Sequence, residues 1–75
     1  MNKTNKQEIA KRLKELRTYK NLSQERFGNI VGVSQDNVSL WENGKSLPTT
    51  EQIVRIVQSF PDDTSADYLL GLKDF

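Results

Sequence analysis

The 75 residues of this chain suffice for one domain with one modest core, because a chain of this size buries only about 60% of its unfolded surface. Cysteine and histidine are both absent, which excludes disulfides, histidine metal clusters and cysteine nucleophiles. The net charge is +1, but seven basic and two acidic residues lie in residues 1–20, whereas residues 21–75 hold four basic and eight acidic ones.

This uneven charge allows contact with phosphates on one side of the molecule only. Candidate phosphate contacts in the basic stretch are Lys3, Lys6, Lys11 and Lys14. The alternative is a solvated helix face without a partner. No apolar run approaches the roughly 20 residues of a membrane span, so we expect a soluble cytoplasmic protein.

The first predicted helix runs from about Asn5 to Lys20. Its apolar side chains Ile9, Leu13 and Leu16 recur at helical spacing. We expect Asn21 to end this helix in a left-handed conformation.

Two short helices follow. Ser23 is a good N-cap for a helix over Gln24 to Val31, which Gly32 ends, and Ser34 is a good N-cap for a helix from Gln35 to about Glu42. Helices of two turns are unstable in isolation. We therefore expect both to pack against the first helix.

Two further helices complete the prediction, and no strand pattern competes with them. Thr49 caps the fourth, with Gln52 at the capping-box position, and Pro61 ends it. Ser65 caps a final helix over Ala66 to Leu70. The predicted fold is all-α, as a single domain over residues 1–75. Its fourth helix buries Ile53, Ile56, Val57 and Phe60.

The most informative stretch lies at about residues 23–42, where two short helices flank a three-residue turn. Gly28 leaves room for a close approach of the next helix, and Gly32 supplies the positive φ that the turn requires. The side chains expected in the shared core are Phe27, Val31, Val33, Val38 and Trp41.

The chain resembles the Xre family of DNA-binding regulators, which includes the phage lambda-type repressors and Cro proteins. The resemblance covers about residues 9–72. It rests on Arg12-Leu13-Lys14-Glu15-Leu16-Arg17, Leu22-Ser23-Gln24-Glu25, Gly32-Val33-Ser34, Trp41-Glu42-Asn43-Gly44-Lys45 and Asp67-Tyr68-Leu69-Leu70-Gly71-Leu72. It implies a five-helix, lambda-repressor-like domain whose third helix enters the major groove of DNA.

The resemblance also implies roles for individual residues. The expected base contacts are Gln35, Asp36, Asn37, Ser39 and Leu40. The expected contacts to the DNA backbone are Gln24, Ser34, Asn43, Gly44 and Lys45. Structural roles are implied for an Arg17–Glu42 ion pair and for Gly28, Gly32 and Trp41. The alternative for Lys45 and Arg55 is that they are solvated surface charges without a partner.

Three features depart from the family pattern. Asp36 puts a negative charge on the third helix, that helix has no Lys or Arg, and Ile30 is apolar at a usually polar position. Ile30, Asp36 and the acidic C-terminal segment with Asp62, Asp63, Asp67 and Asp74 keep open a second hypothesis, a protein-interaction module such as an antitoxin. The chain is too poor in titratable groups for an enzyme pocket, so we expect no cofactor, metal or small-molecule substrate.

The resemblance favours a repressor of transcription that binds double-stranded operator DNA. We also expect a homodimer, at least on DNA, because the contact area of one module is small. Paired recognition helices would then reach half-sites about one helical turn apart. The apolar residues Leu70, Leu72 and Phe75 are the candidates for the contact between the two copies.

Overall fold

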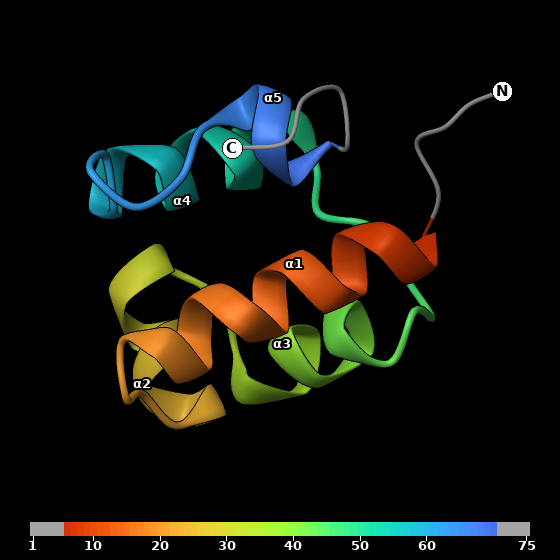
Figure 1. Cartoon of the computed structure of the whole chain (residues 1–75). Coiled ribbons are helices and arrows are strands. Elements are labelled where there is room, and N and C mark those ends of the chain that lie inside the picture. The colour runs from red at the N-terminus through yellow and green to blue at the C-terminus, as the bar shows by residue number, and fades with distance from the viewer. Residues whose placement is uncertain (1–5, 71–75) are drawn as a thin grey trace, which may run out of the picture.

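Helix α1 (Lys6–Tyr19) runs through the middle of the molecule (Figure 1). On one side of it lie α2 (Gln24–Val31) and α3 (Gln35–Glu42), and on the other α4 (Thr50–Ser59) and α5 (Ala66–Leu69). The computed structural model describes residues 6–70, and every regular element within them is a helix. The predicted all-α fold of five helices is confirmed.

Four of the helices begin at a hydroxyl side chain that accepts a backbone N–H of the first turn. The capping residues are Ser23, Ser34, Thr49 and Ser65. At Thr49 the capping box is complete, because the Gln52 side chain also accepts the backbone N–H of Thr49 at 2.8 Å. Each cap stabilises its helix by about 1 kcal/mol, which matters for elements of only two turns.

The helix ends differ slightly from the prediction. α1 ends at Tyr19 rather than Lys20, and Asn21 follows with the expected positive φ of 59°. The predicted start at Asn5 lies outside the described residues. α5 ends at Leu69 rather than Leu70. Leu70 is its C-cap, and its backbone N–H donates to the carbonyl of Ala66 at 2.9 Å.

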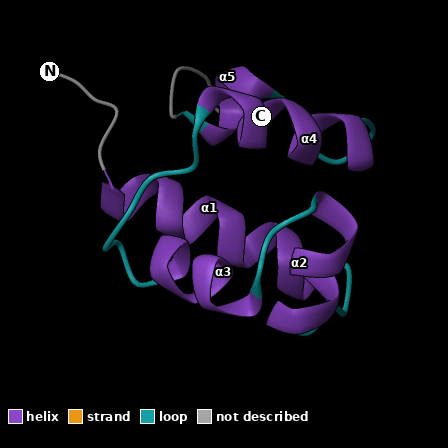
Figure 2. Cartoon of the chain, turned by 180° about the vertical axis from the view of Figure 1, so that it is seen from behind, coloured by secondary structure: helices purple, strands orange, loops and turns teal. Residues whose placement is uncertain are grey.

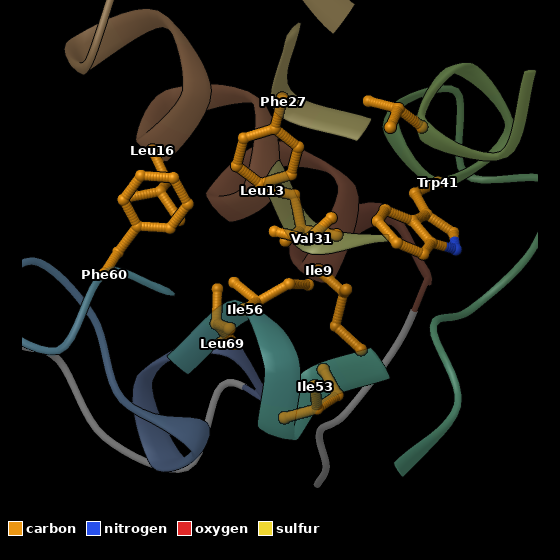
Figure 3. Packing of buried hydrophobic residues seen from close by; sticks show 11 residues of the cluster. Ile9, Leu13, Leu16, Phe27, Val31, Trp41, Ile53, Ile56, Phe60 and Leu69 are labelled. Atoms are coloured by element: carbon orange, nitrogen blue, oxygen red, sulfur yellow. The ribbon is translucent and has the colours of Figure 1, made fainter. Parts of the chain in front are cut away.

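One hydrophobic core joins all five helices (Figure 3). Phe27 of α2 stacks on Phe60 at the end of α4, with ring centroids 5.6 Å apart and planes 7° from parallel. Val33 and Val57, expected to be buried, are partly buried at the edge of this core. Burial of each large side chain stabilises the fold by about 1.5–3 kcal/mol. The buried set is Ile9, Leu13, Leu16, Phe27, Val31, Val38, Trp41, Ile53, Ile56, Phe60 and Leu69.

A candidate nucleic-acid interface

The turn between α2 and α3 consists of Gly32, Val33 and Ser34. Gly32 has φ 82°, and the backbone N–H groups of Gly32 and Val33 both donate to the carbonyl of Gly28, at 2.8 and 2.9 Å. A Cβ on Gly28 would lie 2.6 Å from the carbonyl oxygen of Val33. Only glycine therefore allows the turn to fold back so closely on α2.

The outer face of α3, continued by its C-cap Asn43, carries four side chains in one stripe, at the spacing i, i+3, i+4 and i+7 that defines one side of a helix. We call it the α3 stripe; its members are Asp36, Ser39, Leu40 and Asn43. Val38 and Trp41 on the opposite side are 0% and 2% exposed, so burial of these two side chains fixes which face of α3 points outward.

The α3 stripe carries no cation. Asp36 is its one charged member and is exposed, and no other described residue forms an ion pair with it. Leu40 is 41% exposed, and Asn43 Nδ2 donates to Ser39 Oγ at 3.2 Å. The surface therefore offers one acidic acceptor, one methyl-bearing side chain and neutral hydrogen-bonding groups.

Gln35 and Asn37 lie on either side of this stripe. Gln35 is exposed at the start of α3, on the same side as Ser39. Asn37 is half-buried and lies about 100° around the helix from Asp36, beyond the stripe. Its backbone N–H donates to the capping Ser34 Oγ at 3.2 Å.

A hydrogen-bonded ion pair connects α1, α2 and α3. Arg17 donates from Nε and Nη2 to the two carboxylate oxygens of Glu42, at 2.7 and 3.0 Å. Gln24, the first residue of α2, donates from Nε2 to the same carboxylate at 3.2 Å. The hydrogen bond to Glu42 raises the pKa of Arg17.

Because it is held by Glu42, the Gln24 side chain has a fixed position at the N-terminus of α2, where free backbone N–H groups favour an anion. The sequence did not predict this third member of the Arg17–Glu42 pair.

The loop after α3 lies against the N-terminal end of α1 (Figure 2). Gly44 has φ 71°, and a Cβ on it would lie 2.5 Å from Nε2 of Gln7. Lys45 is exposed, and no other described residue pairs with it. Its backbone N–H donates to the carbonyl of Leu40 at 2.9 Å, which fixes the loop to the end of α3.

The remaining basic side chains near this loop belong to α1. Lys11 and Lys14 are exposed on the edge of α1 that also bears Gln7. Lys6 is exposed at the start of α1, whereas Lys3 lies outside the described residues. Arg55, in contrast, contacts the protein itself: it pairs with Glu51 at 2.9 Å and donates to the carbonyl of Gly32 at 3.4 Å.

Residues 6–70 were also compared with the requirements of a metal site and of a membrane-spanning helix. That part of the chain contains no group of three or more acidic, cysteine or histidine side chains that could hold a metal ion. Its helices are also too short or too polar for one of them to cross a membrane.

Two short helices, a tight glycine turn and a second helix with an exposed outer face define a helix-turn-helix domain, a class of DNA-binding regulator domain. The sequence profile of this class, described as "Helix-turn-helix", matches residues 13–61, which is more than half of the chain. The chain belongs to the helix-turn-helix family.

Two curated proteins illustrate its relatives. The chain is 44% identical over 52 residues to "Antitoxin PezA" of Streptococcus pneumoniae, covering 69% of this chain and 33% of that protein. It is 40% identical over 53 residues to "HTH-type transcriptional activator BcrR" of Enterococcus faecalis, covering 71% of this chain and 26% of that protein. The chain thus spans a third or less of the length of these relatives, and no solved structure gives a significant match.

Proposed function

We propose that this domain binds operator DNA selectively and regulates transcription, with α3 in the major groove. The observation that carries the proposal is the α3 stripe, an outward face of three polar side chains and one exposed leucine on a helix whose other side is buried. The name of one relative, a transcriptional activator, supports the class of function.

The side chains of α3 match particular base edges. The exposed Gln35 amide can both donate to and accept from adenine, at N7 and N6. The Asp36 carboxylate accepts from the amino group of cytosine, and Leu40 packs against the methyl group of thymine. Because α3 has no Arg or Lys, the bidentate contact to guanine that such side chains make is absent from the proposed code.

Contacts to phosphates set the position of α3 in the groove. One phosphate contacts the Gln24 side chain and the backbone N–H groups at the start of α2. Asn43, Gly44 and Lys45 contact the sugar-phosphate backbone at the other end of α3, and Ser34 does so beside the turn. Ser39 in the α3 stripe and Asn37 on its flank are the two remaining base contacts of the proposal.

The active form that we propose is a pair of copies bound to two half-sites about 34 Å apart. A single module makes few contacts, and α3 has no cation to add phosphate binding. Two linked copies bind far more tightly than one, because the second contact becomes intramolecular. Occupation of a promoter in this way blocks polymerase, which makes the protein a repressor.

Selection from a pool of random duplex DNA tests this proposal. We expect the full chain to enrich a short motif, arranged as two related half-sites, and to bind it at least about 1000-fold more tightly than random duplex. Binding should weaken steeply as salt rises. Recovery of a pool with no sequence preference would contradict the proposal.

A second function rests on a different surface. Ile30 is 46% exposed on α2, and a relative carries the name antitoxin. An antitoxin-type domain would bind a protein partner through such an apolar side chain.

Co-purification with the product of the neighbouring gene, for wild type and Ile30→Asp, tests this second function. Loss of a stoichiometric complex on substitution supports it, and no complex with the wild-type chain contradicts it. Glu25→Gln, an exposed change on the same helix, is the matched control.

A further inference from the structure

A hollow of about 290 Å³ lies between α1 and the α4–α5 segment. It is lined by Glu15, Leu16, Tyr19, Asp63 and Tyr68, and we call it the α1–α5 hollow. Leu16 belongs to the buried core, at 6% exposure, and forms the floor of the hollow, whereas Tyr19 is 74% exposed. An aromatic side chain this exposed is a frequent anchor of protein interfaces.

The polar groups of the hollow favour a cation. Glu15 and Asp63 contribute carboxylates, and the two tyrosines contribute ring faces of negative electrostatic potential. Lys20 already pairs with Asp63 at 3.1 Å. Glu15, in contrast, has no ion-pair partner among residues 6–70, so one negative charge at the hollow is uncompensated.

The same surface already accommodates a guanidinium group. Arg12 lies over the ring of Tyr68, at 4.5 Å from its centroid. Arg12 is committed to the protein, since Nη1 donates to the carbonyl of Tyr68 at 2.7 Å and Nε to Glu8 at 2.6 Å. The contact shows that the packing between α1 and α5 suits a cation stacked on tyrosine.

The hollow and the α3 stripe lie on different edges of α1. Arg17 and Gln7 contact α3 and the loop after it. Arg12, Glu15 and Tyr19 face α5 and the segment before it. An occupant of the hollow therefore leaves the α3 stripe accessible.

We propose that the α1–α5 hollow is a docking site for a protein partner that inserts a lysine or arginine flanked by apolar residues. The cation pairs with Glu15 against the ring of Tyr19, and the apolar neighbours pack on the rest of that exposed ring, above the floor that Leu16 forms. The charge of the hollow and the exposure of Tyr19 carry this inference, which does not depend on the function proposed for α3.

Selection of a displayed library of random 12-residue peptides against the full chain tests the inference. We expect enriched peptides to carry a lysine or arginine beside an apolar residue. Glu15→Gln and Tyr19→Ala should each weaken their binding by about tenfold. The matched controls Glu25→Gln on α2 and Val54→Ala on α4, both exposed positions, should leave peptide binding unchanged.

Enrichment of acidic or purely apolar peptides, or of none, would overturn the inference, as would equal binding to wild type and Glu15→Gln. Both substitutions are at exposed positions, so the variants should melt at the wild-type temperature. Binding of operator DNA by Tyr19→Ala should also be unchanged, which separates failure of this site from failure of the DNA-binding face.

Discussion

Arg17 in the last turn of α1 and Glu42 at the end of α3 form a bidentate ion pair, with N–O distances of 2.7 and 3.0 Å. The two side chains are only 13% and 3% exposed. Arg17 Nη1 also donates to the carbonyl of Leu22 at 2.8 Å, and Gln24 shares the Glu42 carboxylate. One carboxylate thus holds together the scaffold helix, the start of α2 and the end of α3.

Glu42→Gln should lower the free energy of unfolding by about 2 kcal/mol, because a largely buried guanidinium loses its charged acceptor. Thermal unfolding followed by circular dichroism measures this. Glu51→Gln is the matched control: it removes a pair whose side chains are 45% and 76% exposed, which stabilises by less than about 1 kcal/mol. Equal losses for the two variants would contradict a special role for Glu42.

Local signals in the sequence predicted most of the fold. Ser23, Ser34 and Thr49 mark helix starts through interactions within three residues, and Gly32 marks the turn by its conformational freedom. Such signals need no knowledge of the tertiary structure.

Contacts between distant residues were not predictable in this way. The hydrogen bond from Gln24 to Glu42 and the guanidinium of Arg12 on the Tyr68 carbonyl join residues 18 and 56 positions apart. They depend on how the helices pack, which no local pattern encodes. The position of Asn37 beside the α3 stripe, in contrast, is predictable. Once Val38 and Trp41 are taken as the buried side of α3, the step of about 100° per residue places Asn37 between that side and the outer face.

Thr64 offers a test of packing away from α3. Its side chain is 4% exposed, and its Oγ1 finds no hydrogen-bond partner among residues 6–70. Thr64→Val removes this buried hydroxyl with little change of shape and should raise the free energy of unfolding by about 1 kcal/mol. Thr18→Val is the control, because Thr18 Oγ1 is exposed and donates to the carbonyl of Lys14 at 2.9 Å. A lower melting temperature for Thr64→Val would contradict this account.

Lys45→Gln should weaken binding to the selected operator and to random duplex by the same factor, because a phosphate contact carries no sequence information. The slope of log affinity against log salt should fall by about 1. Lys20→Gln, which removes a cation paired with Asp63 near the α1–α5 hollow, should leave the slope unchanged. Equal slopes for wild type and Lys45→Gln would remove this residue from the interface.

Leu40 is proposed to contact a thymine methyl group. This contact can be tested by removing either the methyl group from the DNA or the leucine side chain from the protein. Replacing that thymine by uracil should weaken wild-type binding by about fourfold, the effect of one buried methyl group. Leu40→Ala should bind the two duplexes equally, because the packing partner of the methyl is gone. Wild-type binding that is insensitive to uracil at every thymine of the site would contradict the contact.

The central claim, that exposed side chains of α3 select the bases, is tested most directly by the base preferences of Gln35→Ala. Binding to all single-base variants of the selected operator is measured for this variant and for wild type. We predict that Gln35→Ala loses about 1–3 kcal/mol of discrimination at one base pair per half-site and melts at the wild-type temperature. Unchanged preferences at every position would contradict the claim.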